Sequence, residues 1–177
     1  METLTDQAAR DKVFDLIRDI QVTQLVTLDR NGKLRARPMV AQQHDAAGDL
    51  WFYTPANSGK LDEIAHHPEV MLNYSDPRNQ NYVSILGDAE VLHDREMIRQ
   101  LWSEAMRVWF PKGPDDPDIA LLRVAVREAD YWDSPSSTFV HAYGYVKAVA
   151  TGKRPDPGDN KHVEFADGEA SSRDRPS

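Results

Sequence analysis

A series of short strand-like runs joined by turn signals constrains the fold of this chain more than any other feature. The clearest turn signal is the pair Asn31-Gly32, which lies between the runs TQLVTLD and LRARPMVAQQ. An Asn-Gly pair in this setting is typical of a type I′ hairpin turn, in which both central residues have positive φ. The two runs are therefore predicted to pair as antiparallel strands.

Four further strand-like runs follow at hairpin spacing. They are LWFYT, Val70–Ser75, Tyr82–His93 and a stretch that alternates at Leu122, Val124 and Val126 and ends at Tyr131-Trp132-Asp133. Gly87, inside the third of these runs, predicts a bulge or tight bend of the kind that barrel corners need. No Gly-rich strand-to-helix turn is found, which argues against a dinucleotide-binding fold. The prediction is a mainly β fold, a six-stranded antiparallel split barrel with flanking helices.

Helices are predicted between and around these strands. The helical period places Ala9, Val13, Leu16, Ile17 and Ile20 on one face of residues 6–20, with Thr5 as N-cap. Ser58 can cap a short helix that ends at His66, and Asp94 can cap a longer one that reaches Met106. A last helix is expected over about Ser137–Thr151, ended by Gly152.

The domain organisation follows from length and composition. A chain of 177 residues has room for one core, so residues 1–152 are predicted to form a single domain. From Lys153 to Ser177 the sequence is polar and mixed in charge, which predicts a disordered tail.

Charge and cysteine content exclude several classes of function. A net charge of -8 disfavours nucleic acid and anionic membranes as partners. The absence of cysteine excludes disulfides, thiolate metal sites and thiol nucleophiles, and it fits a reducing compartment. The N-terminal segment lacks a signal-peptide pattern, and no apolar run is long enough to cross a membrane, so a cytoplasmic protein is expected. No metal-ligand pattern and no catalytic acid–base constellation is recognisable.

The segment Arg35-Ala36-Arg37-Pro38-Met39 is the first candidate for chemistry. Proline cannot donate to a strand ladder, so Pro38 belongs at an edge or a bulge. Arg35 and Arg37 are two residues apart and share one face of the strand. Two interpretations stay open, an anion-binding strand or an edge strand that charge and proline protect from aggregation.

The segment FYTPANSGK is the second candidate. Ser58 at a helix start and Lys60 shortly after it would direct a hydroxyl, free backbone N–H groups and an ammonium group at one point. That combination is an anion site at a helix N-terminus. The alternative is a capping serine followed by a solvated lysine.

Two tryptophans at segment ends form the third candidate. Trp109 precedes Phe110-Pro111, and Trp132 lies next to Asp133. Tryptophan most often fills a core or an interface. The alternative is that these two rings lie against a planar ligand.

Taken in order, these segments resemble the pyridoxamine 5′-phosphate oxidase-like family of FMN-binding split barrels, and more closely its bacterial general-stress-protein branch. The resemblance covers about Val22 to Asp133. Its matching pieces are Arg35–Met39, Leu50–Thr54 with Ser58–Lys60, His67–Val70, Tyr82–Ser84 with Gly87, Trp109–Pro111 with Asp116-Pro117, and Ala129–Asp133.

The resemblance implies a homodimer with the flavin in the groove between two barrels. The positions that it implies are Arg37, Pro38 and Met39 along the isoalloxazine edge, Tyr53 and Thr54 beside the ribityl chain, Ser58 and Lys60 on the phosphate, and Trp132, with Trp109 as a second candidate, from the partner subunit. A dianionic phosphate needs a cation and free donors, while the flat ring needs an apolar slot, so these residue types suit the ligand.

Two departures from the family pattern concern the vitamin B6 reaction. The oxidases carry an arginine where this chain has Gly59, and their C-terminal Arg-x-His pair has no counterpart after Trp132. The resemblance therefore implies a flavin-binding, stress-type protein that uses FMN, with FAD as a substitute, and that acts as a flavin-dependent oxidoreductase if it is an enzyme. The alternatives are pyridoxamine or pyridoxine 5′-phosphate oxidation, a non-enzymatic flavin carrier or stress sensor, and a barrel that has lost its ligand.

Overall fold

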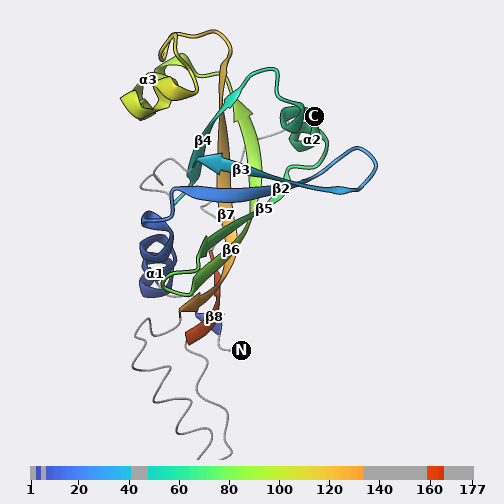
Figure 1. Ribbon diagram of the computed structural model, residues 1–177. Coiled ribbons are helices and arrows are strands. Elements are labelled where there is room, and N and C mark those ends of the chain that lie inside the picture. The colour runs from blue at the N-terminus through green and yellow to red at the C-terminus, as the bar shows by residue number, and fades with distance from the viewer. Residues whose placement is uncertain (1–2, 5–6, 41–47, 134–158, 166–177) are drawn as a thin grey trace, which may run out of the picture.

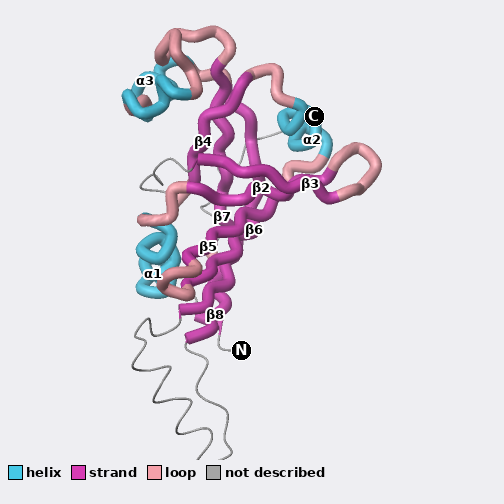
Figure 2. Tube along the Cα trace, in the orientation of Figure 1, coloured by secondary structure: helices cyan, strands magenta, loops and turns pink. Residues whose placement is uncertain are grey.

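The computed structural model describes residues 3–4, 7–40, 48–133 and 159–165 (Figures 1 and 2). Its elements are β1 Thr3–Leu4, α1 Gln7–Arg18, β2 Val22–Leu28, β3 Leu34–Val40, β4 Leu50–Pro55, α2 Gly59–His66, β5 Glu69–Asp76, β6 Asn81–Leu92, α3 Arg95–Leu101, the 3-10 helix η1 Glu104–Val108, β7 Ile119–Asp133 and β8 Asp159–Glu164. The fold is mainly antiparallel β with flanking helices, as predicted. Within the described ranges, no helix is both long enough and apolar enough to cross a membrane.

The long pair β6–β7 forms the spine of the molecule (Figure 1). The strands follow the order β1-β8-β7-β6-β5-β2-β3, and β4 pairs with β7 off this path. The six predicted strands are confirmed as β2 to β7, and β1 and β8 add to them. Each pairing is antiparallel except that of β1 with β8.

The β2–β3 hairpin is confirmed, but its turn is not type I′. Among the described residues only Gln80 has positive φ without being glycine, so Asn31 lies in the ordinary φ range and Gly32 alone, at 73°, is left-handed. The Gly32 N–H donates to the Asp29 carbonyl at 2.9 Å, and Asp29 Oδ1 accepts from the N–H groups of Asn31 and Lys33. The aspartate side chain organises the turn, which makes a second positive φ unnecessary.

Two backbone predictions are confirmed. The β6–β7 register shifts between Leu86 and Gly87, and a Cβ atom on Gly87 would lie 2.4 Å from the Ala125 carbonyl oxygen. This position therefore needs glycine, and the bulge bends the spine. Pro38 lies in β3, which among the described strands ends the strand order and pairs along it with β2, so this proline is in an edge strand.

The core is divided into two clusters that lie on opposite faces of β4. Leu50 and Phe52 face the main cluster, to which α1 contributes Val13 and Ile17. The alternate residues of β4, Trp51 and Tyr53, face a second cluster under α3 and η1. Its other members are Ile98, Met106, Phe110, Ile119 and Leu121. Strand alternation explains the division, because successive side chains point to opposite faces.

The helix predictions are confirmed in part. α1 buries Ala9, Val13 and Ile17, as its period predicted. The single helix expected from Asp94 to Met106 is wrong, because α3 ends at Leu101 and η1 follows it separately. Trp102 is extended, and its ring packs edge-on against Tyr53 at 5.8 Å, so a tertiary contact outweighs the local helical period.

The prediction of a disordered tail is wrong for residues 159–165. β8 pairs with β7 from Glu128 to Asp133, and Val163 is fully buried. Phe165 packs edge-on against Phe14 and lies under the Arg10 guanidinium. Two apolar side chains suffice here because the edge of β7 offers the segment a ladder of backbone partners. The helix predicted at 137–151 lies outside the described residues.

Candidate functional site

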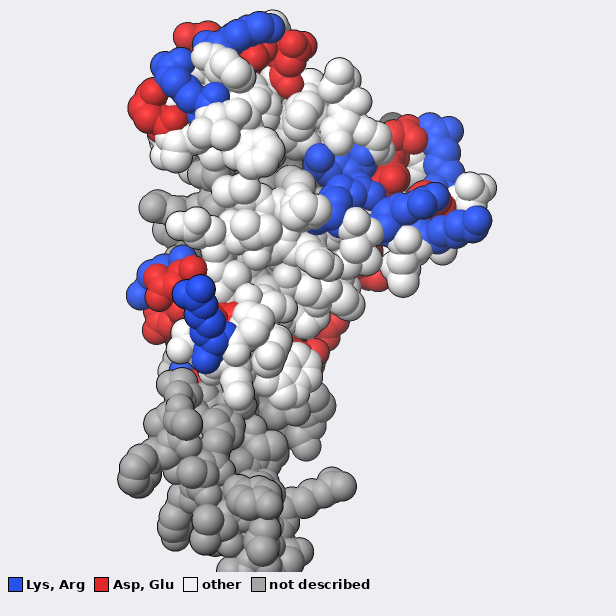
Figure 3. Space-filling view, in the orientation of Figure 1, with Lys and Arg blue, Asp and Glu red and all other residues white. Residues whose placement is uncertain are grey.

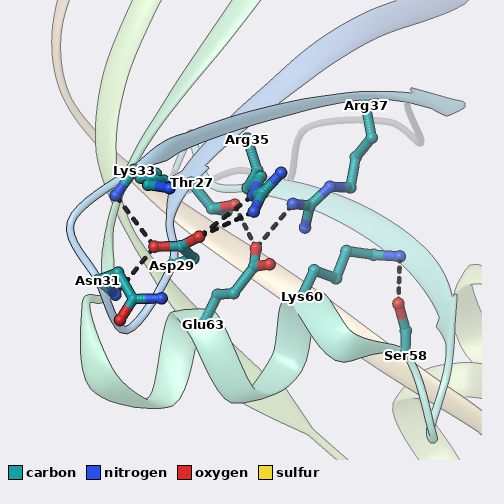
Figure 4. Close-up of polar contacts among 9 residues, drawn as sticks. All are labelled: Thr27, Asp29, Asn31, Lys33, Arg35, Arg37, Ser58, Lys60 and Glu63. Atoms are coloured by element: carbon teal, nitrogen blue, oxygen red, sulfur yellow. Dashed lines mark hydrogen bonds and ion pairs between the residues drawn. The ribbon is translucent and has the colours of Figure 1, made fainter.

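Cations from two elements meet where β3 passes over α2 (Figure 4). Arg35 and Arg37 extend from one face of β3 toward the helix, and Lys60 lies in the first turn of α2. We call Arg35, Arg37, Ser58, Lys60 and Glu63 the cation cluster. In the space-filling view, basic side chains gather over this end of the molecule, while much of the neighbouring surface is uncharged (Figure 3).

Lys60 is the most buried cation of the cluster, with 9% of its surface exposed. Its ammonium group donates to Ser58 Oγ at 2.9 Å, and no carboxylate of the described residues forms an ion pair with it. Burial, followed by the charge of Arg37, lowers the pKa of Lys60, and Glu63 opposes this only in part. A buried ammonium group without a carboxylate partner is a favourable place for an anion.

Ser58 lies at the N-cap position of α2, as predicted, but its hydroxyl forms no capping hydrogen bond. The hydroxyl accepts from Lys60 instead, and the Leu61 N–H donates to the Ser58 carbonyl oxygen at 3.0 Å. The side chain is therefore directed to the lysine rather than to the helix backbone.

Glu63 receives two short hydrogen bonds. Thr27 Oγ1 donates to its Oε2 at 2.6 Å, and Arg37 Nη2 donates to the same oxygen at 2.7 Å. Burial acts to raise the pKa of Glu63, but the bonds from Thr27 and Arg37 outweigh it and lower the pKa overall. This carboxylate is thus ionised at neutral pH and fixes Arg37 against α2.

Arg35 is oriented by the hairpin turn. Its Nε and Nη2 donate to Asp29 Oδ2 at 3.2 and 3.1 Å. The backbone N–H of Lys33 is the main cause that lowers the pKa of Asp29, with Asn31 and Arg35 adding to it. The same aspartate therefore shapes the turn and holds one guanidinium group at the rim of the cluster.

The structure separates the other predicted site residues from the cluster. The Tyr53 side chain lies in the second core cluster, where its hydroxyl donates to the Ile98 carbonyl at 2.8 Å and burial raises its pKa to about 12. Met39 is buried in the main core and Pro38 is exposed. Thr54 is fully buried, and its Oγ1 has no hydrogen-bond partner among the described residues.

The two tryptophans lie outside the cluster. Trp109 is 65% exposed and follows η1, and Trp132 is 41% exposed near the end of β7. Ala120 pairs with Thr54 shortly before α2, and from Ala120 to Trp132 is a span of 12 residues, about 40 Å of extended strand. Figure 1 accordingly shows α2 and the β8 end of β7 in opposite halves of the molecule.

Sequence reasoning placed Ser58 and Lys60 at one point and named Arg37 as a separate candidate, but it missed Glu63, Thr27 and Asp29. The signal for Glu63 was its spacing of three residues from Lys60, which places both on one helix face. Thr27 could be found only once the packing of β2 against α2 was known. These residues show that the cations are held by partners on three elements.

The fold is that of a small, mainly antiparallel β protein, and the cation cluster beside its short helix α2 is a candidate site for an anion. Residues 8–156 match the model of the pyridoxamine 5′-phosphate oxidase-like family. The chain therefore belongs to that family, and its fold is the FMN-binding split barrel of the family's solved members.

Individual relatives agree with this assignment. The protein bli-3 of Neurospora crassa is 26% identical over 162 residues, which is 86% of this chain and 77% of that protein. A pyridoxine/pyridoxamine 5′-phosphate oxidase of Photorhabdus laumondii is 27% identical over 131 residues, or 74% of this chain, but the match spans only 51% of that enzyme.

Solved structures show a similar fold over most of the chain. A candidate general stress protein 26 from Jannaschia sp. CCS1 superimposes with a TM-score of 0.75 at 26% identity, over 90% of this chain and 100% of that chain. The general stress FMN/FAD-binding protein of Xanthomonas citri gives a TM-score of 0.64 at 26% identity, over 75% and 93% of the two chains.

Proposed function

We propose that this protein binds FMN between the subunits of a two-fold homodimer, with the flavin phosphate on Lys60, Ser58 and Arg37. The observation that carries the proposal is the buried Lys60 ammonium group, which has a hydroxyl and a guanidinium neighbour but forms no ion pair with a carboxylate of the described residues. A phosphate dianion would supply the missing charge. When bound, the flavin supplies electron or hydride chemistry, and the chain supplies position and polarity.

We place Arg37 at a different part of the ligand than the family resemblance implied. The guanidinium group is held by Glu63 beside Lys60, so it would meet the phosphate rather than the isoalloxazine edge. The backbone of β3 around Pro38 remains the candidate for contact with the ring, because β3 ends the strand order of the described strands.

The position of Trp132 supports the proposed homodimer. This ring lies too far along β7 to reach the cation cluster of its own chain, and it stays 41% exposed. A second copy in two-fold arrangement would cover Trp132 and carry it to the partner's cation cluster. Light scattering should give about twice the 20.1 kDa of one chain, and the monomer mass at micromolar concentration would contradict the dimer.

A stress-type flavoprotein is favoured over the vitamin B6 oxidase. Gly59 takes the place of a phosphate-binding arginine, and a Cβ atom built on it meets nothing within 4 Å, so an arginine would have room there. We expect Gly59→Arg to tighten FMN binding by about tenfold, since one charge-assisted hydrogen bond is gained. Formation of pyridoxal 5′-phosphate in a coupled assay would instead favour the oxidase function.

Flavin titration with and without the phosphate group tests the proposal. Lys60→Ala should weaken FMN binding by about ten- to hundredfold, measured by flavin fluorescence quenching, and should leave riboflavin nearly unaffected. Lys112→Ala is the matched control, because that lysine is exposed and pairs with Asp116 and Asp118 of its own loop, between η1 and β7. Equal binding of FMN by wild type and Lys60→Ala would overturn the phosphate assignment.

A further inference from the structure

A carboxylate within a cation cluster needs an explanation. The Glu63 carboxylate is bound to the Arg37 guanidinium group, on the side of it away from the Lys60 ammonium group (Figure 4). The side chains of Arg37 and Glu63 are only 23% and 17% exposed. A negative charge at this place repels an incoming anion and by itself lowers the affinity of the site for phosphate. Glu63 must therefore have a second effect that compensates for this repulsion. The contacts of Glu63 show what that is.

One oxygen of Glu63 joins three elements. Oε2 accepts from Thr27 of β2 and from Arg37 of β3, while the carboxylate itself belongs to α2. The Thr27 side chain is buried, and its hydrogen bond to Glu63 is the shorter of the two. The carboxylate is thereby fixed in position and in turn fixes the guanidinium group.

Arg37 and Lys60 would otherwise move apart. Each carries a positive charge, and the charge of Arg37 disfavours the protonated form of the buried lysine. Without the carboxylate, the flexible arginine side chain would extend into solvent, where its charge is hydrated.

We infer that Glu63 is a positioning residue, which holds Arg37 beside Lys60 so that both cations meet the same phosphate. The inference rests on the proposed function and deepens it. The site gains a preformed pair of cations, and this gain outweighs the repulsion between the carboxylate and the ligand.

Two variants of Glu63 separate position from charge. Glu63→Gln keeps an amide oxygen that accepts from Arg37, so FMN binding should stay within about threefold of wild type. Glu63→Ala removes the acceptor, so FMN binding should weaken about tenfold while riboflavin binding changes little. The matched control is Asp62→Ala, which breaks the exposed pair of α2 with Arg30 on the same hairpin and should change neither.

A measurement without flavin keeps the inference testable on its own. The 15N relaxation of the Arg37 Nε–H group should report a rigid side chain in wild type and Glu63→Gln and a mobile one in Glu63→Ala. If Glu63→Ala fails to fold, Thr27→Val removes the bond that fixes the carboxylate and should increase the mobility of Arg37.

The FMN affinity and the Arg37 mobility of the two Glu63 variants together decide the role of Glu63. Weak FMN binding with a mobile Arg37 in Glu63→Ala, restored in Glu63→Gln, supports the inference. Tighter FMN binding in both variants means that the carboxylate only repels, and equal loss for FMN and riboflavin means a purely structural role; either overturns it. If wild type binds no FMN, the proposed function fails, while an Arg37 that stays rigid in Glu63→Ala overturns the positioning role independently.

Discussion

At the α2 end of the molecule, Arg35 and Arg37 have carboxylate partners from their own chain, whereas at the far end of β6 and β7 two aromatic rings face solvent side by side. Tyr82 and Trp132 are directly opposite each other in the β6–β7 ladder, and each is 41% exposed. Cross-strand neighbours of this kind share one face of the sheet. At one end both arginines are paired within the chain, and at the other two aromatic rings stay partly exposed.

The difference teaches which half of a site a single chain can build. Charged groups are arranged by hydrogen bonds over a few ångströms, so a hairpin and a helix suffice for the cation cluster. An aromatic patch is stabilised only when a surface covers it. We therefore interpret the two ends as halves of one intersubunit flavin site.

Disrupting the strand pair that joins the two ends should have the largest effect. In Gly87→Ala the new Cβ would lie 2.4 Å from the Ala125 carbonyl oxygen and 2.9 Å from Val124 Cγ1, so backbone must move. We expect a loss of about 3 kcal/mol in the free energy of unfolding. Urea denaturation measures it, with Gly59→Ala as control because that position is open. A loss similar to that of the control would contradict the bulge.

Removing β8 should damage the aromatic end alone. Deletion of residues 153–177 removes the fully buried Val163 and exposes the surface of β7 on which β8 packs. The free energy of unfolding should fall by about 2–3 kcal/mol. Hydrogen exchange should accelerate at the amides of 128–133 and stay slow in α2. The control chain ends after Phe165 and keeps β8. Unchanged protection of β7 in the shorter chain would mean that the tail is dispensable for the fold, as its composition predicted.

Tyr53→Phe sharpens the boundary of the cation end. It removes the buried hydrogen bond to the Ile98 carbonyl, so the free energy of unfolding should fall by about 1 kcal/mol. FMN and riboflavin affinities should stay within about twofold, measured by the same fluorescence titration. Weaker binding of both flavins at unchanged stability would instead return the hydroxyl to the ribityl chain, as the family resemblance implied.

Acid should weaken the cation end slightly. The folded-state pKa of Glu63 lies below its ordinary 4.5, so its contribution to stability is present above that pH and is lost as pH falls through the depressed value. The difference in melting temperature between wild type and Glu63→Gln should therefore be largest at neutral pH and shrink below about pH 4. A difference that grows on acidification would mean that the pKa is raised.

Local sequence signals predicted the parts of the fold that depend on neighbouring residues. The hairpin, the Gly87 bulge and the edge position of Pro38 follow from backbone rules that hold wherever those residues occur. Trp102 and Phe165 were misjudged because distant contacts, with Tyr53 and Phe14, decide their conformations.

The candidate site was predictable to a similar degree. Ser58 and Lys60 are two residues apart, so the sequence itself brings them together. The link from Arg37 to Glu63 spans 26 residues and the link from Thr27 spans 36, and neither spacing carries a local signal. Family resemblance supplied the position of the site, while its internal support had to come from the packing of α2 against the hairpin.

Mixing two defective chains tests the intersubunit site most directly. Lys60→Ala lacks the phosphate half and Trp132→Ala lacks the aromatic half, so each homodimer alone should bind FMN weakly. A heterodimer of the two carries one site with both defects and one intact site. After subunit exchange, FMN titration should therefore recover tight binding at about half of the sites of each heterodimer. Failure to recover any tight binding, with exchange confirmed by mass spectrometry, would contradict the intersubunit site.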